Sequence, residues 1–362
     1  MSQRAIPASL MRGGTSKGLY ILKADLPTDV ATRDAVLLAA MGSPDPRQID
    51  GVGGAHPLTS KIAVVSKSER ADADIDYLFL QIFPDRAIVT DQQNCGNILA
   101  GIGPFAIENG LISATGDVTR VRIFMVNTAS IAEATVQTPG GRVTYAGEAR
   151  IDGVPGTHAP VMLNFLDVAG SSTGALLPTG NATDEIDGVK VTLIDNGMPV
   201  VVMQASDFGL SGVESPEEIE ANAEVRARVE AIRLKAGPLM NLGDVTKKSV
   251  PKMTLISPAR EGGDVSTRTF IPHRVHDAIG VLGAVSVATA LALKGSVAGG
   301  KGISGAKTFD IEHPSGFFSI EMEMTGEGAG LKVTRSALLR TARLLMRGEV
   351  LVPKTLWPED AA

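Results

Sequence analysis

The 362-residue sequence has a single cysteine, and aromatic residues make up only 4% of it. One cysteine excludes an intramolecular disulfide and any site built from several thiolates, and it is typical of a reducing cytosol. The scarcity of aromatics argues against a stacking platform for single-stranded nucleic acid. The net charge of −6 argues against a surface that follows a phosphate backbone. We therefore expect a cytoplasmic protein that does not bind nucleic acid.

Long apolar runs are also missing. The N-terminal residues Met1–Ala5 lack the apolar core of a secretory signal. The longest uncharged apolar stretch, Ala278–Leu293, is about four residues short of a bilayer span. Because it consists largely of Ala, Gly, Val and Ser, it predicts a helix packed inside the protein. We expect no membrane association.

Hydrophobic residues make up 44% of the sequence, and the hydrophobic periodicity predicts a β-rich chain with a few helices. One helix should begin at Ser215, because a capping residue is followed by proline and two acids. The predicted strands are 61–66, 75–83, 121–126, 132–137, 188–194, 199–204, 252–257 and 266–271, and the predicted helices are 31–41, 215–236 and 334–346.

The two halves of the chain are similar in pattern. Lys61 and Lys252 each open an apolar strand that ends in serine, and each strand is followed by a segment of small residues. These segments begin at Cys95 and Gly280, 34 residues (61 to 95) and 28 residues (252 to 280) after the lysines. Two related lobes are the simplest explanation, and chance similarity between two β-rich halves is the alternative. We place the lobes at residues 1–185 and 186–362, with the last strand or helix able to cross back to the first lobe.

Both small-residue segments predict helices with very thin side chains. Such a helix is suited to a strongly curved sheet that wraps around it, because larger side chains would hold the strands too far away. The repeat also pairs the glycine-rich segment Arg12–Gly18 with Asp195–Pro199, which makes Asn196 a candidate binding residue.

Cys95 lies between Asn94 and Gly96-Asn97 at the predicted start of a helix. Unpaired amides and the positive end of a helix dipole favour a thiolate, which can act as an acid or a base. The same amides can donate hydrogen bonds to a carboxylate or a developing enolate. An inert buried cysteine is the alternative, but the polar neighbours favour a chemical role.

Lys61 follows Ser60 and precedes an apolar strand, so strand alternation could point its side chain into a cleft. A desolvated lysine amine can accept a proton. The alternative is an ordinary solvated lysine at the start of a strand.

Two segments are candidates for binding an anion. The first, Arg12–Gly18, offers a guanidinium, the hydroxyls of Thr15 and Ser16, and flexible amides such as that of Gly14. In the second, His273 and His276 flank Arg274. This histidine pair lacks an acidic third ligand at a recognisable spacing, so we expect no metal site.

Five motifs together are specific: 11–18 (MRGGTSKG), 41–45 (MGSPD), 48–51 (QIDG), 59–61 (TSK) and 94–97 (NCGN). With them the whole chain resembles the 2-methylaconitate isomerase family, and the segment 55–61 is most similar to the 4-oxalomesaconate tautomerases of that family. The resemblance implies an α+β, diaminopimelate epimerase-like fold. In that fold two pseudo-symmetric lobes, each a β-barrel-like sheet wrapped around a central helix, hold the site between them.

The resemblance also implies a cofactor-independent isomerase that needs no metal. Its reaction would be a 1,3-allylic proton shift on 4-oxalomesaconate, a small polycarboxylate formed in the breakdown of gallate, protocatechuate and lignin-derived aromatics. Lys61 and Cys95 would be the acid–base pair, with their roles left open, and a homodimer is compatible with the sequence. The substrate-binding residues would be Arg12, Gly14, Thr15, Ser16, Ser60, Asn94, Gly96, Asn97, Asn196, Lys252, His273 and Arg274.

Three other functions stay open. A 2-methylaconitate or aconitate isomerase would use the same residues. A proline-type epimerase is disfavoured, because related epimerases carry a second cysteine where this chain has Gly280. A non-catalytic carboxylate-binding protein is the third alternative.

Overall fold

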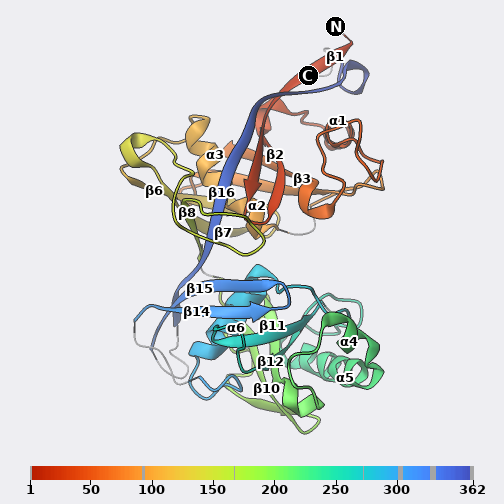
Figure 1. Cartoon of the computed structure of the whole chain (residues 1–362), viewed down its shortest axis with the longest axis vertical. Coiled ribbons are helices and arrows are strands. Elements are labelled where there is room, and N and C mark those ends of the chain that lie inside the picture. Colours follow the sequence, from red (N-terminus) through yellow and green to blue (C-terminus); the bar gives the residue numbers. More distant parts are fainter. Residues whose placement is uncertain are drawn as a thin grey trace. The chain divides into compact units, whose positions relative to one another are not determined.

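The computed structural model describes residues 2–91, 94–166, 168–271, 273–300, 305–326 and 332–358. The chain forms two compact units (Figure 1). The first contains Met1–Leu163 and Arg340–Ala362, and the second contains Asn164–Leu339. The sequence-based boundary at 185/186 therefore falls inside the second unit, and the end of the chain belongs to the first.

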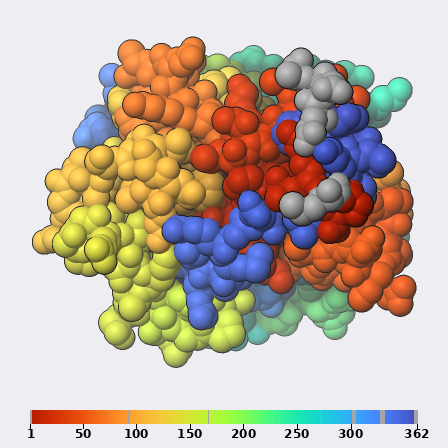
Figure 2. Space-filling model, turned by 90° about the horizontal axis from the view of Figure 1, so that it is seen from above, coloured from red at the N-terminus to blue at the C-terminus, as the bar shows by residue number. Residues whose placement is uncertain are grey.

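In the first unit a sheet closes on itself. Its strands follow the order β1-β2-β3-β4-β6-β7-β8-β16, and β16 also pairs with β1. At one end of this pairing Gln3 lies opposite Pro353, and at the other end Gly13 lies opposite Ala342. Figure 2 shows this pairing on the surface, where the blue C-terminal segment lies against the red N-terminal strand. The strands are β1 (Gln3–Gly13), β2 (Ser16–Leu22), β3 (Lys61–Lys67), β4 (Ile75–Ile82), β5 (Val89–Thr90, paired with β4), β6 (Val118–Met125), β7 (Ser130–Gln137), β8 (Pro160–Leu166) and β16 (Lys332–Pro353).

Three helices pack on the two faces of this sheet. The outer helix, α1 (Val30–Met41), shares a buried apolar cluster with alternate residues of β3, among them Ile62 and Val64. The inner helices, α2 (Gly96–Leu99) and α3 (Ile102–Glu108), contact β1, β2, β3, β6 and β7 from inside. The sheet thus wraps around a thin helical segment, as the sequence predicts.

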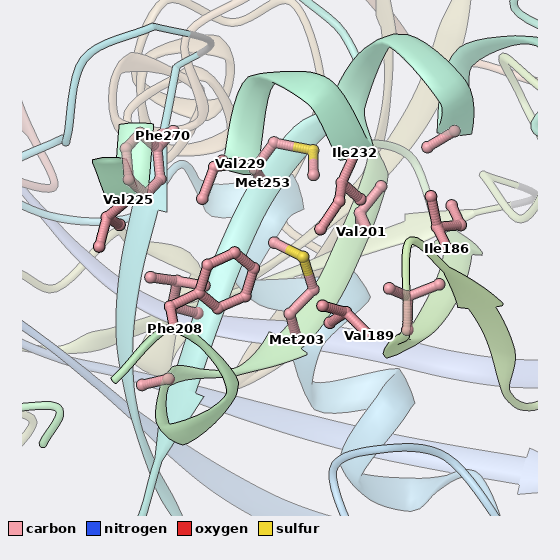
Figure 3. Close-up of a cluster of buried hydrophobic side chains, with 14 of the residues drawn as sticks. Ile186, Val189, Val201, Met203, Phe208, Val225, Val229, Ile232, Met253 and Phe270 are labelled. Carbon is pink, nitrogen blue, oxygen red and sulfur yellow. The ribbon is translucent and has the colours of Figure 1, made fainter. Parts of the chain in front are cut away.

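The second unit repeats this plan. Its strands follow the order β15-β14-β13-β12-β11-β10-β9, and the first part of β16 pairs with β15. Helix α6 packs on one face, and α5 packs on the other through Val225, Val229 and Ile232 (Figure 3). The elements are β9 (Asp184–Ile186), β10 (Val189–Asp195), β11 (Pro199–Gln204), α4 (Pro216–Ala221), α5 (Ala223–Leu239), β12 (Lys252–Ser257), β13 (Val265–Phe270), α6 (Val281–Ala292), β14 (Lys307–His313) and β15 (Gly316–Thr325).

The repeat between the halves is confirmed by the topology. In each unit a helical connection joins two parallel strands, β2 to β3 and β11 to β12, and the next strand is antiparallel. Lys61 pairs in register with Gly18, and Lys252 pairs with Val200. Cys95 and Gly280 are the N-cap residues of α2 and α6, so they occupy equivalent places in their units.

All eight predicted strands are present, but the helix predicted over 334–346 is wrong. These residues belong to β16. Their Ala, Leu and Arg content favours a helix, but sheet pairing decides the outcome here. Leu338 pairs with Ile320 of β15, and Met346 pairs with Leu10 of β1.

The helix predicted over 215–236 is interrupted at Asn222. This residue leaves the helical conformation (φ −85°, ψ 90°), and its side chain accepts a hydrogen bond from Val225 N. It therefore ends α4 and caps α5. None of the helices in the described part of the chain is both long and apolar enough to cross a membrane.

Because the sheet lies close to the thin inner helices, adding a methyl group to one of their glycines should lower the stability of the protein. A Cβ atom on Gly101 would lie 2.4 Å from Tyr20 Oη, so we expect Gly101→Ala to cost about 1–3 kcal/mol of unfolding free energy through overpacking. Gly116→Ala is the matched control, because Gly116 is exposed and a Cβ there meets no described atom within 4 Å. Urea denaturation of both variants measures the difference. Equal unfolding midpoints for the two variants would show that the sheet does not pack tightly against the inner helix at Gly101.

Candidate active site

Lys61 is the first residue of β3, opposite Gln81 on β4. Its neighbour Ile62 faces α1, so strand alternation turns Lys61 to the inner face, where α2 and α3 lie. The side chain is only 6% exposed. Its Nζ donates a 2.6 Å hydrogen bond to Gln81 Oε1 and lies 5.0 Å from the ring centroid of Phe79. None of the ion pairs among the described residues includes Lys61.

The segment that leads into Lys61 is fastened by Gln48. This side chain is 1% exposed, and its Oε1 accepts hydrogen bonds from Ser60 Oγ at 2.6 Å and Ala55 N at 2.8 Å. Its Nε2 donates to Ser43 Oγ at 3.1 Å. Ser60 is thus engaged in holding the chain, and Gln48 is a supporting residue that the sequence showed only as part of a motif.

Cys95 is the N-cap residue of α2, which confirms the predicted helix start. The residue is partly exposed. Helix α2 is a single turn, Gly96–Leu99, and the chain continues into α3. Its first-turn amides have no acceptor within the helix, as in any helix, so they can donate to an anion beside the thiol.

Two inward-facing tyrosines hold α2 against the sheet. Tyr20 Oη donates to Ile98 O at 2.6 Å, and Tyr77 Oη donates to Cys95 O at 3.3 Å. Burial, and next the charge of Cys95, raise the pKa of both phenols well above the ordinary value. Both therefore remain protonated donors. The predicted strand 75–83 already placed Tyr77, Phe79 and Gln81 on one face, which is the signal that could have identified them.

The β1–β2 turn meets the start of α2. It consists of Gly14, with a φ of +49°, and Thr15. Asn97 Oδ1 accepts from Thr15 N at 3.4 Å, and Asn97 Nδ2 donates to Thr15 Oγ1 at 3.1 Å. Because the parallel strands β2 and β3 begin at the same end of the sheet, these contacts place the Cys95 helix start at the end where Lys61 lies.

Arg12 fixes this turn from the other side. Its Nη1 donates to Gly14 O at 2.8 Å and to the carbonyl and hydroxyl oxygens of Thr341 on β16. Burial, and next the charge of Arg343, lower the pKa of Arg12. Ser16 Oγ and Asn94 Oδ1 are buried and have no hydrogen-bond partner within the described residues. The described residues therefore leave the hydrogen-bonding capacity of these two oxygens unused.

In the second unit, Lys252 occupies the place equivalent to Lys61. Its Nζ donates to Ser249 O at 2.6 Å. Burial, and next the charge of Arg233, lower the pKa of Lys252 to about 8. This amine is therefore partly neutral just above neutral pH.

The other expected residues of the second unit are placed differently. Asn196 is fully buried, and its Nδ2 donates to Thr289 Oγ1 at 2.9 Å and to Ser336 Oγ at 3.0 Å. Both N–H groups of its amide therefore bond to side chains in the core. His273 is exposed, lies 3.5 Å from Glu230 and lines a hollow of about 300 Å³ beside α5. Arg274 is exposed. Among the described residues, no group of three or more His, Cys, Asp or Glu side chains is placed to hold a metal ion.

The first unit thus carries an amine at the start of β3 and a thiol at the start of α2, at the same end of the sheet, and each can take up and release a proton. Beside them lie the first-turn amides of α2 and the Gly14–Thr15 turn, which suit a carboxylate. This arrangement can move a proton on a small anionic substrate.

The chain is similar to known isomerases over nearly its full length. A (4E)-oxalomesaconate Delta-isomerase from Novosphingobium sp. (strain KA1) is 65% identical over 349 residues, 96% of this chain and 97% of its own. A 4-oxalomesaconate tautomerase from Pseudomonas putida (strain KT2440) is 56% identical over 363 residues, 99% of each chain. The crystal structure of a methylitaconate-delta-isomerase superposes with a TM-score of 0.89 at 34% identity, covering 98% of this chain and 97% of that one.

The chain has the α+β, diaminopimelate epimerase-like fold predicted from the sequence, which it shares with this solved structure. Residues 3–353 match the model of the family described as PrpF protein. The chain belongs to the PrpF protein family, and it is an isomerase.

Proposed function

We propose that the chain is a cofactor-independent, cytoplasmic tautomerase that shifts a proton along the allylic system of 4-oxalomesaconate in the catabolism of aromatic compounds. The observation that carries this proposal is the 65% and 56% identity, over nearly the full length, to two isomerases named for this substrate. The inward-facing Lys61 and the Cys95 helix start supply the chemistry that such a shift needs.

The reaction is balanced without any co-reactant. The carbon γ to a conjugated carbonyl is acidic, because its carbanion spreads over a dienolate. One of Lys61 and Cys95 removes that proton, the electron pair of the C–H bond forms the new double bond, and the charge moves to the carbonyl oxygen. The other residue returns a proton to the carbon two positions away, which restores the carbonyl and leaves the formula unchanged.

The dienolate and the carboxylates need donors. We assign the developing oxyanion to the first-turn amides of Gly96 and Asn97, because preorganised backbone donors stabilise such a charge more than they stabilise the neutral carbonyl. We assign a carboxylate to Thr15 and to the buried Ser16 Oγ, which lacks a partner in the described part of the chain. Arg12 holds the turn that contains Thr15 and leads into Ser16.

The test is incubation with 4-oxalomesaconate and, separately, 2-methylaconitate in deuterated water, followed by ¹H NMR. We expect rapid isomerisation of 4-oxalomesaconate with deuterium at the carbon that receives the proton. Turnover of 2-methylaconitate alone would instead assign the aconitate-type reaction. Binding of either compound without exchange would overturn the catalytic proposal in favour of a carboxylate-binding protein.

A further inference from the structure

Gln81 lies directly opposite Lys61 in the β3–β4 register and is itself buried, with 6% of its surface exposed. Its Oε1 accepts the 2.6 Å hydrogen bond from Lys61 Nζ. No motif in the sequence points to Gln81. Its proximity to Lys61 follows from strand pairing across 20 residues of chain.

The Gln81 amide has only one orientation that satisfies its surroundings. Its Nε2 lies 3.1 Å from the carbonyl oxygens of Pro57, Ser60 and Ile82. Three acceptors on that side require the NH₂ group to face them. The carbonyl oxygen must therefore face the lysine. The reversed amide would place two donors against Lys61 Nζ and an oxygen against three oxygens.

This orientation gives Lys61 a fixed acceptor that carries no charge. An ammonium and a neutral amine both have N–H groups, so either can donate to an amide oxygen. A carboxylate at the same place would favour the ammonium, because an opposite charge nearby stabilises the charged form. A residue that passes a proton must be stable in both states during one turnover. A neutral acceptor suits that requirement and an ion pair does not.

We propose that Gln81 is a positioning residue that holds the Lys61 amine at its working place without fixing its protonation state. This proposal rests on the proposed function, because the role assigned to Gln81 requires that Lys61 exchanges protons with the substrate. The backbone carbonyls of Pro57 and Ser60, on the segment fastened by Gln48, complete the support by orienting Gln81.

The test is Gln81→Glu, compared with Gln81→Met and with Gln3→Glu as a matched control that adds one charge at an exposed residue of the same unit. For Gln81→Glu we expect the limb of the kcat/KM–pH profile that reports the lysine to move to higher pH by about one unit or more. For Gln81→Met, which removes the acceptor, we expect kcat to fall by about tenfold or more without that movement, with KM changed less. Gln3→Glu should match the wild type.

A second measurement does not depend on turnover. In protein carrying [ε-¹³C]lysine, the Lys61 signal is assigned by its loss in Lys61→Met, and its titration midpoint is followed by NMR. We expect the midpoint to rise in Gln81→Glu. Activity lost in both Gln81 variants with an unmoved Lys61 midpoint would overturn the positioning role and indicate a structural one.

The two measurements separate this proposal from the proposed function. A Lys61 midpoint that moves in Gln81→Glu, in a protein that isomerises neither substrate, would leave the Gln81 contact established and reject the tautomerase. Turnover of 4-oxalomesaconate by a protein whose Lys61 midpoint and pH profile do not move in Gln81→Glu would support the tautomerase and reject the positioning role of Gln81. If Gln81→Glu does not fold, the Gln81→Met comparison decides, and wild-type kcat in that variant would contradict the proposal.

Discussion

Lys61→Met should lower kcat/KM for 4-oxalomesaconate by about 10²–10⁴-fold, the usual contribution of a positioned acid or base. Methionine keeps an unbranched stem of similar length, so it can remain packed near the Phe79 ring while the amine is lost. The fold should survive, because Lys61 forms none of the ion pairs among the described residues and its backbone pairing is unchanged.

Steady-state kinetics and a thermal unfolding curve check this expectation together. Lys67→Met is the matched control, because Lys67 lies at the exposed end of the same strand. We expect wild-type rates from that variant. Equal losses in the two variants, with both proteins folded, would leave no special role for Lys61.

Cys95→Ser should produce a loss of similar size with little change in stability. A hydroxyl is a far weaker acid than a thiol, so it cannot exchange a proton with the substrate efficiently near neutral pH. Serine is nevertheless a preferred N-cap residue, and Cys95 is the N-cap of α2, so the helix start should be kept or slightly strengthened. Rates are measured by steady-state kinetics and stability by urea denaturation.

Alkylation gives an independent check on Cys95. Because it is the only cysteine and is partly exposed, iodoacetamide should add one label per chain and abolish turnover in parallel. Substrate should slow the labelling. Near-wild-type activity in Cys95→Ser, or full activity in the singly labelled protein, would contradict the proton-transfer role.

Strand periodicity and the lysine repeat predicted most of the fold, because alternating buried residues carry a local signal. β16 shows the limit of that signal. Its Ala-, Leu- and Arg-rich sequence favours a helix, but it pairs with β15, β8 and β1, and the last two of these strands are distant in sequence. The break at Asn222 was also not predicted, although the buried residues Ile219 and Val225 on either side of it are not at helical spacing and asparagine is a preferred N-cap residue.

For the site, the sequence supplied the residues that stand in short motifs, Lys61 and Cys95 above all. It did not supply Gln81 or Tyr77, because their roles depend on strand register and on the path of α2. It named Asn196 as a binding residue but did not predict that its buried Nδ2 would donate to Thr289 and Ser336. Motif spacing places a residue along the chain, and packing decides which way its side chain points.

The most direct test of proton transfer by Lys61 is ¹H NMR of 4-oxalomesaconate in deuterated water with wild type and Lys61→Met side by side. We expect the wild type to isomerise the substrate and place deuterium on the carbon that gains the proton, and the variant to show neither change over the same time. Isomerisation and deuterium uptake at wild-type rates in Lys61→Met would contradict the account.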